Sequence, residues 1–248
     1  MTVTEHRVRL WLSQPQALAH TSAVLWRPAS DEGGCGLVLG HGAGSTMAHP
    51  VIRAVGQGLA DRGYPVLAFN FAYAEAGRRR PDPATRLRSA FRDATDLAAE
   101  VLGKRPLVLG GRSLGGRIAS LLAAEGQPCA GLALLGYPLH PYRSSPPGAV
   151  DGAALTQGRP ERLRTDHWSA ITVPTLFVQG DRDRLCDLDL LAAERQKLAG
   201  PSTLHVLAGA DHGYKVRKRE GRDAASVLAE ATEAVTGWVQ SLRVGVSR

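Results

Sequence analysis

Apolar and polar positions alternate in two ways along this chain. Residues 7–12 and 22–27 alternate in the manner of strands with one exposed face. Short runs that are mostly apolar are typical of strands buried on both faces of a sheet. Such runs predict further strands at residues 37–40, 65–71, 107–111, 131–137, 174–179 and 203–207.

Between these runs, apolar residues fall at helical spacing. Pro50 can begin a helix that Gly63 ends, because proline suits the first turn of a helix and glycine suits its end. Residues 72–83 are rich in Arg, Pro and Gly and are predicted to form a loop. Further helices are predicted at about 87–101, 115–125, 187–199 and from about 222.

Strands that alternate with helices predict an α/β fold, with a mostly parallel central sheet and helices on both faces. The first two strands have no helix between them, so we expect an antiparallel edge at the N-terminus. We expect one domain over residues 1–248. Residues 138–170 lose the periodicity and are expected to form a short insertion or partial cap over one end of the sheet.

Composition supports a globular protein, since 44% of the 248 residues are hydrophobic. No apolar run is long enough to span a bilayer, and the N-terminal residues have no apolar signal core. We therefore expect no membrane partner and no export. The three cysteines form no CxxC pair and predict reduced thiols in the cytoplasm.

The formal net charge of +7 raises the question of an acidic partner. Basic residues are dense only at 78–80 and 215–219, and neither stretch is interleaved with aromatic residues. No nucleic-acid module is recognisable, so we expect no nucleic-acid partner. Arg143, or the arginines at 78–80, would favour anionic substrates if they lie across the opening of a site.

The stretch GGRSLGG at 110–116 places a serine among glycines. A phosphate-binding P-loop needs Lys followed by Ser or Thr after its last glycine, and here Arg117 and Ile118 follow. The residues fit GxSxG between a buried strand and a helix, which is the setting of a nucleophile elbow. Ser113 is therefore the candidate nucleophile.

A serine nucleophile needs a base and an orienting carboxylate. His212 lies in a glycine-flanked loop after a predicted strand and is the candidate base. Asp181 and Asp183 both follow another strand, and both are candidates for the acid. Asp211 is a poor candidate because adjacent side chains diverge. The order Ser, Asp, His is the order found in α/β-hydrolases.

A tetrahedral oxyanion needs two backbone N–H donors. The amide of Leu114 is one candidate, and the amide of Ala43, in the loop His41-Gly42-Ala43-Gly44, is the other. His41 is expected to take a structural or substrate-binding role. Tyr137, Tyr142 and Trp168 are candidates to line the substrate pocket, with plain packing as the alternative for each.

Five motifs together resemble the α/β-hydrolases related to dienelactone hydrolases. They are LVLGHGAGSTMAHP, GGRSLGGRIAS, LLGYPLHP, PTLFVQGDRD and GADHGY. The chain resembles most closely the branch with the testis-expressed hydrolase-like proteins and a subunit of the NSL histone-acetyltransferase complex. The resemblance implies an α/β-hydrolase fold and a triad of Ser113, Asp183 and His212. It favours Asp183 over Asp181, since the acid is the last residue of that motif.

Together these features predict a serine hydrolase that cleaves small acyl esters through an acyl-enzyme. Dienelactone hydrolases carry cysteine at the elbow, whereas this chain carries Ser113. The expected partner is a small-molecule ester, and no metal or organic cofactor is expected. The alternative is a hydrolase-like module with little or no activity that binds another protein. The residues do not separate esters from thioesters or amides, and they do not indicate an oligomeric state.

Overall fold

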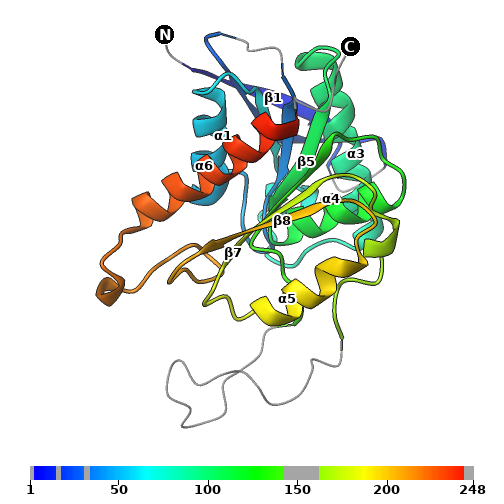
Figure 1. Cartoon of the computed structure of the whole chain (residues 1–248). Helices are drawn as coiled ribbons and strands as arrows, with labels where there is room; N and C mark the ends of the chain where they lie inside the picture. The colour runs from blue at the N-terminus through cyan, green and yellow to red at the C-terminus, as the bar shows by residue number, and fades with distance from the viewer. Residues whose placement is uncertain (1–2, 15–17, 31–33, 142–161, 243–248) are drawn as a thin grey trace.

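The computed structural model describes residues 3–14, 18–30, 34–141 and 162–242. The strands in this part form one eight-stranded sheet in the order β1-β2-β4-β3-β5-β6-β7-β8 (Figure 1). The strands are β1 (Thr4–Trp11), β2 (His20–Arg27), β3 (Gly36–Gly40), β4 (Val66–Phe69), β5 (Leu107–Arg112), β6 (Gly131–Leu135), β7 (Thr175–Gly180) and β8 (Ser202–Leu207).

The sheet is parallel from β4 through β8 and antiparallel at its N-terminal edge. β1 pairs with β2 over its full length, from Thr4 opposite Arg27 to Trp11 opposite His20. β2 also runs antiparallel to β4, whereas β3 pairs in parallel with both β4 and β5. The predicted antiparallel edge is confirmed. Every later strand therefore ends at the same edge of the sheet.

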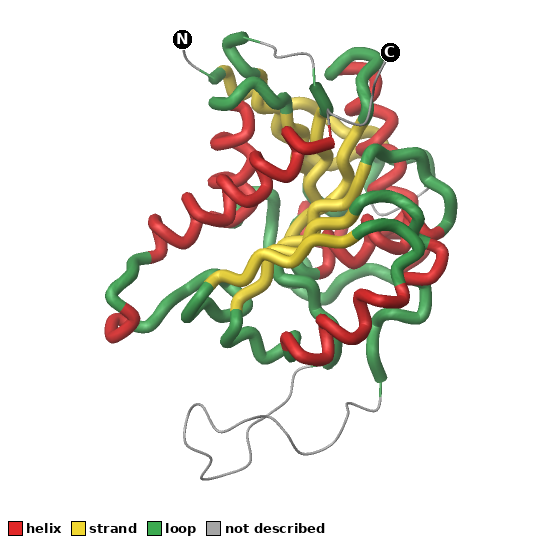
Figure 2. Tube along the Cα trace, in the orientation of Figure 1, coloured by secondary structure: helices red, strands yellow, loops and turns green. Residues whose placement is uncertain are grey.

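Helices cover both faces of the sheet (Figures 1 and 2). α1 and α6 pack together on one face, and α3 and α4 pack together on the other. Each predicted helix periodicity corresponds to a buried face, such as Ile52 and Val55 of α1 or Phe91 of α3. The helices are α1 (Pro50–Ala60), α2 (Ala72–Glu75), α3 (Ala84–Val101), α4 (Leu114–Ala124), α5 (Leu188–Glu194) and α6 (Ala224–Leu242).

The segment predicted to be a loop at 72–83 contains one helical turn, α2. Two polar residues fix this turn, because Glu75 accepts hydrogen bonds from Ser22 (2.7 Å) and from Asn70 (2.8 Å). These contacts join α2 to β2 and to the residue after β4, so they could not be read from local periodicity. Three short 3₁₀ turns were also not predicted: η1 (Trp168–Ala170), η2 (Arg195–Lys197), where the helix expected to reach 199 tightens, and η3 (Lys218–Glu220).

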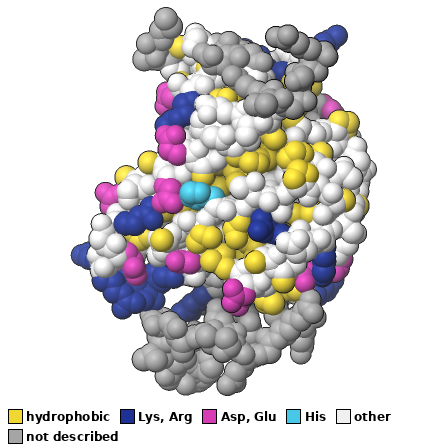
Figure 3. All heavy atoms as spheres, viewed as in Figure 1, with side chains coloured by type: hydrophobic (Ala, Val, Ile, Leu, Met, Phe, Trp, Pro, Cys, Tyr) yellow, Lys and Arg dark blue, Asp and Glu magenta, His cyan; other side chains and the backbone are white. Residues whose placement is uncertain are grey.

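Most of the expected insertion falls outside the described residues, which stop at 141 and resume at 162. The described ends of that segment contain η1 and irregular backbone. Lysines and arginines gather around the β8–α6 connection on the face seen in Figure 3. In the described part of the chain, no helix has both the length and the apolar character needed to cross a bilayer.

Candidate active site

The turn between β5 and α4 is sharp and strained, as expected of a nucleophile elbow. Ser113 adopts φ 50° and ψ −109°, which costs a non-glycine residue about 1–3 kcal/mol. The turn fits only because Gly115 lies against β3. A Cβ atom at 115 would stand 2.1 Å from the carbonyl oxygen of Gly40. The predicted strand–turn–helix setting of Ser113 is confirmed.

Three side chains from distant parts of the chain form one hydrogen-bonded line. The Oγ atom of Ser113 lies 2.9 Å from Nε2 of His212. Nδ1 of His212 lies 2.7 Å from Oδ2 of Asp183. An ionised carboxylate only accepts hydrogen bonds, so Nδ1 carries the ring proton. The lone pair of Nε2 then faces the serine hydroxyl, which is the arrangement that a general base requires.

Asp183 is held in place on both carboxylate oxygens. It is 3% exposed, and its Oδ2 atom also accepts a hydrogen bond from the side-chain amide of Gln179 (2.6 Å). Its Oδ1 atom accepts from the backbone N–H of Leu185 (2.8 Å). Gln179 is fixed in turn, because its oxygen accepts from the backbone N–H of Tyr137 (2.8 Å). The carboxylate that orients His212 therefore has little freedom to move.

The other two candidate aspartates serve their own loops. Asp181 accepts a hydrogen bond from the backbone N–H of Gly209 (2.8 Å). Asp211 accepts from the backbone N–H groups of Gly213 (2.8 Å) and Lys215 (3.0 Å). These bonds stabilise the turns that carry the candidate base. The geometry thus separates Asp183, which contacts the imidazole, from its neighbours, which do not.

Hydrogen bonds to one carbonyl group hold the loop after β3 in place. The oxygen of Gly42 accepts hydrogen bonds from Nδ1 of His41 (2.8 Å), the hydroxyl of Tyr73 (3.3 Å) and the N–H of Ser45 (3.3 Å). The N–H and C=O groups of a trans peptide point in opposite directions. Fixing the carbonyl of Gly42 therefore fixes the direction of the Ala43 N–H.

The two candidate oxyanion donors are unoccupied by protein groups. Neither the N–H of Ala43 nor that of Leu114 donates a hydrogen bond to any described residue. The amide of Leu114 also opens α4, where the helix dipole favours negative charge. Both amides are thus available to an oxyanion.

His41 lies beneath this loop and is fully buried. Its Nε2 atom accepts a hydrogen bond from the backbone N–H of Phe71 (3.1 Å), while Nδ1 is bonded to Gly42. Burial lowers the pKa of His41 to about 4, so the ring is neutral near pH 7. With both nitrogens engaged, His41 takes the structural one of its two expected roles.

The aromatic residues expected in the pocket pack elsewhere. Tyr137 is fully buried, its ring packs against Trp168 and Phe177, and its hydroxyl donates to the carbonyl of Arg164 (2.7 Å). Trp168 is fully buried as well. Both positions match the packing alternative. Tyr142 lies outside the described residues.

Arg112 is a residue of the site that the sequence did not single out. Its guanidinium donates a hydrogen bond to the carbonyl of His212 (3.1 Å). It also lies against Gly42, where a Cβ atom would stand 2.5 Å from the Nη1 atom of Arg112. Burial lowers the pKa of Arg112, while Asp183 and Asp211 favour its charged form. The motif GxSxG allows any residue at this position, so it could not predict a role for Arg112.

His49 is a second such residue. Its Nδ1 atom accepts a hydrogen bond from the backbone N–H of Val51 (3.2 Å) at the start of α1. Burial, then the charges of Arg112 and Lys215, lower the pKa of His49 to about 4. It is therefore a neutral residue near the candidate base. Within the described ranges, no group of His, Cys, Asp and Glu side chains is placed to hold a metal ion.

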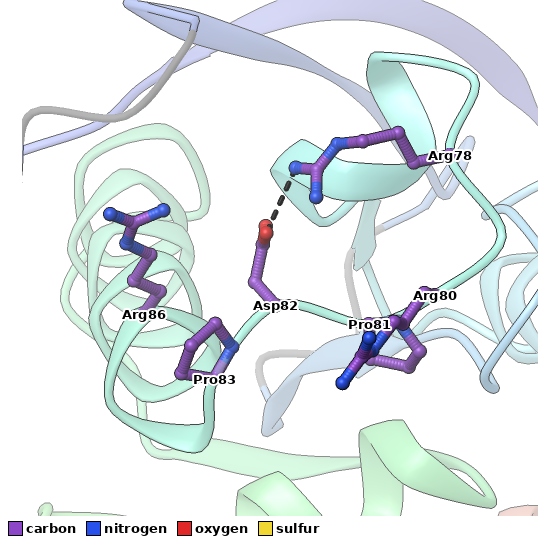
Figure 4. Close-up of a pocket in the computed structure, with 6 residues that line it drawn as sticks. All are labelled: Arg78, Arg80, Pro81, Asp82, Pro83 and Arg86. Carbon is purple, nitrogen blue, oxygen red and sulfur yellow. Dashed lines mark hydrogen bonds and ion pairs between the residues drawn. The ribbon is translucent and has the colours of Figure 1, made fainter.

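A cavity of about 430 Å³ lies beside the loop that follows α2 (Figure 4). Arg78 pairs with Asp82 (2.8 Å) at its edge, and Arg80 and Arg86 line it without an ion pair to any described residue. The same loop lies beside the oxyanion loop, since a Cβ atom on Gly44 would stand 3.9 Å from the carbonyl oxygen of Arg79. This cavity is thus a basic neighbour of the candidate site.

The sheet, its antiparallel edge and the elbow together define an α/β-hydrolase fold. A family model described as an alpha/beta hydrolase domain matches residues 34–240. The chain therefore belongs to the alpha/beta hydrolase domain family.

Solved structures share this fold at low sequence identity. An α/β serine hydrolase homologue from Coxiella burnetii is 18% identical, with a TM-score of 0.68 over 95% of this chain and 97% of that one. A dienelactone hydrolase from Anabaena variabilis is 20% identical, with a TM-score of 0.66 over 94% and 97% of the two chains. Est1E from Butyrivibrio proteoclasticus is 17% identical, with a TM-score of 0.69 over 95% and 99%.

These likenesses support the superfamily and a dienelactone-hydrolase-like fold. The closer resemblance, to the branch with the testis-expressed proteins and the NSL subunit, stays a prediction. Sequence identities of 17–20% show that the fold is shared, but they do not show which reaction this chain catalyses.

Proposed function

We propose that this chain is a serine hydrolase that cleaves small carboxylic esters through an acyl-enzyme. The observation that supports it is the line from Ser113 through His212 to Asp183, with separations of 2.9 Å and 2.7 Å. The unoccupied amides of Ala43 and Leu114 lie in the two loops from which the fold's oxyanion donors come. A merely structural role for Ser113 would not explain why a strained residue is placed against an imidazole.

The chemistry follows from these positions. His212 takes the proton of Ser113 as the Oγ atom attacks the ester carbonyl, and Asp183 stabilises the imidazolium that forms. The amides of Ala43 and Leu114 bind the oxyanion, and loss of one such donor typically costs about 3–4 kcal/mol. The imidazolium then protonates the leaving alcohol. Water, deprotonated by His212, releases the acid and regenerates the serine.

The substrate preference follows from the charged surroundings. Arg80 and Arg86 line the cavity near the oxyanion loop, so an ester with a negative charge on its acyl or alcohol part is favoured over a neutral one. The reaction requires no group beyond the protein and water. We also propose a cytoplasmic location, since none of the cysteines in the described ranges forms a disulfide.

Hydrolysis of p-nitrophenyl acetate and butyrate by wild type and by Ser113→Ala tests the proposal. We expect the variant to lose activity by about 10⁴-fold or more, because the nucleophile is absent. Ser89→Ala, which truncates a buried serine on α3, is the matched control and should retain activity. Equal rates for wild type and Ser113→Ala would overturn the proposal.

Labelling with a fluorophosphonate gives a second readout that does not depend on the ester chosen. An activated serine reacts with this reagent, and peptide mapping should place the label on Ser113 alone. A protein that folds but carries no label and hydrolyses neither ester would match the alternative, a hydrolase-like binding module.

A further inference from the structure

A second basic cavity, of about 400 Å³, lies beside α4 on the side of the segment that contains η1. Its polar lining comes from Arg117 of α4 and from Arg162, Arg164, Asp166 and His167. Leu121, Pro141 and Leu163 complete the described lining. This cavity is distinct from the one in Figure 4, and no residue lines both.

Among the described residues that line this cavity, positive charge exceeds negative charge. Three guanidinium groups and one carboxylate leave two positive charges. Among the described residues, no carboxylate forms an ion pair with Arg117, Arg162 or Arg164. The Nε atom of Arg117 is buried without a hydrogen-bond partner there, as are those of Arg112 and Arg195 outside the cavity. Unpaired buried polar groups of this kind are rare, and each calls for an explanation.

Two arginines of α3 do have a carboxylate partner, unlike those of the cavity. Arg88 and Arg92 of α3 both pair with one carboxylate, that of Glu125. His167 adds no charge to the cavity, because burial and then Arg117 lower its pKa to about 4. The neutral ring is fixed by the hydroxyl of Ser120, 2.8 Å from its Nε2 atom.

The three guanidinium groups also repel one another. The pKa of Arg164 lies below its usual value, because burial and then the charges of Arg117 and Arg162 destabilise its positive form. Arg164 is nonetheless held in place, since its Nη1 atom donates to the carbonyl of Pro138 (3.1 Å). A bound anion would offset this repulsion, which the described residues of the free protein do not compensate.

We propose that Arg117, Arg162 and Arg164 form a binding site for a phosphate group, either inorganic phosphate or the phosphate of a small phosphomonoester. Guanidinium groups match phosphate oxygens with two parallel hydrogen bonds each. Phosphate near pH 7 carries between one and two negative charges, which suits the two uncompensated positive charges. The cavity is large enough for the group and a short organic part.

The site does not depend on the proposed hydrolysis. Arg117 and Leu114 lie three positions apart on one face of α4, about 4.5 Å along the helix axis. The phosphate site therefore shares α4 with the candidate oxyanion donor but shares no residue with the triad. Binding can be measured in the inactive Ser113→Ala protein as well as in wild type.

Titration calorimetry on the full chain tests the proposal, with inorganic phosphate and phenyl phosphate as separate ligands. Wild type should bind at least one of them saturably at millimolar concentrations. Arg117→Gln and Arg162→Gln should each weaken that binding by about tenfold, since each removes a charge-assisted contact. Arg9→Gln, an exposed arginine on β1, is the control with the same change in charge and should bind as wild type does.

The two ligands distinguish the sources of the phosphate. Binding of inorganic phosphate alone assigns the site to the free ion, and tighter binding of phenyl phosphate assigns it to a phosphomonoester. Arg162 is exposed, so Arg162→Gln keeps the fold even if Arg117→Gln does not. The proposal is overturned if wild type binds neither ligand, or if Arg162→Gln binds as tightly as Arg9→Gln.

Discussion

The candidate nucleophile precedes the first residue of α4 and the phosphate site lies beside the same helix, yet the polar groups of the two regions are partnered differently. Around the triad, Asp183 has partners on both oxygens, and the carbonyl of Gly42 has three. In the second cavity, Arg117 keeps a buried nitrogen without a partner in the described structure. Arg112, beside the triad, also has a buried nitrogen without a partner in the described structure. The acid and the oxyanion loop are thus held by protein groups before any ligand arrives, whereas the arginines of the second cavity have no carboxylate partner among the described residues.

This difference has a physical reason. Chemistry requires groups that do not reorganise during the reaction, so a catalytic region gains from partners built into the fold. A binding region gains affinity from groups that are still unsatisfied in the free protein, because the ligand then replaces poor contacts with good ones. Substitutions in and around the two regions, and a change of pH, test this contrast.

The largest effect is expected from the carboxylates. Asp183→Asn should lower kcat for p-nitrophenyl acetate by about 10⁴-fold, because the amide no longer holds His212 in the tautomer with a free Nε2. Asp181→Asn, two residues away, should change kcat by less than about threefold, since its side chain accepts a hydrogen bond from Gly209 and none from the imidazole in the described structure. Similar losses in the two variants would show that the loop, and not the contact with the imidazole, sets the rate.

The next effect concerns stability and pH. The folded pKa of His41 is about 4, below the ordinary value of 6.5, so the unfolded chain binds more protons in between. The stability that neutral His41 contributes is therefore present above pH 6.5 and is lost as the pH falls toward 4. Between pH 7.5 and pH 5 the free energy of unfolding should fall by about 2 kcal/mol from this residue.

Urea unfolding at the two pH values measures that fall. His167 has the same folded pKa but is half-buried, so solvent screening reduces its share. His167→Gln should therefore retain most of the fall seen in wild type. A free energy of unfolding that does not change between pH 7.5 and pH 5, or a fall abolished in His167→Gln, contradicts the prediction.

A smaller effect is expected from the hydroxyl that helps to pin the oxyanion loop. Tyr73→Phe removes one of three hydrogen bonds to the Gly42 carbonyl and should lower kcat by about tenfold with little change in KM. Tyr137→Phe is the matched variant, because its buried hydroxyl bonds to Arg164 instead. Equal effects of the two substitutions on kcat would mean that Tyr73 acts only through stability.

The smallest effect is expected at the cavity in Figure 4. Arg80→Gln should lower kcat/KM for p-nitrophenyl hydrogen succinate by about threefold, since an exposed charge contributes little in water. The value for p-nitrophenyl acetate should stay the same. An equal decrease for both esters would indicate a structural role for Arg80 and no preference for anions.

The sequence predicted the alternating strands and helices of this molecule, and it predicted the residues whose backbone conformation only certain motifs allow. Strand–helix alternation predicted the sheet, and Ser113 was found because an elbow needs glycines at fixed positions. Asp183 could be separated from Asp181 only by a resemblance, since both follow the same strand. Which of them meets the imidazole depends on how the turn folds in three dimensions.

The residues that escaped prediction act through contacts between distant segments. Tyr73 reaches Gly42 from a segment predicted to be a loop, and Arg112 reaches the carbonyl of His212 across a hundred positions. Nothing in their local sequence indicates these partners. Arg117 and the pair Arg162 and Arg164 lie about fifty positions apart in the sequence, so the sequence did not predict that they line one cavity.

The contact between Arg112 and Gly42 makes two positions dependent on each other. The guanidinium fills the space that any side chain at 42 would need. A larger residue at 42 would therefore force the end of the Arg112 side chain to move, and its hydrogen bond to the carbonyl of His212 would be disturbed. Selection at position 42 thus reaches the loop of the candidate base through a single flexible side chain.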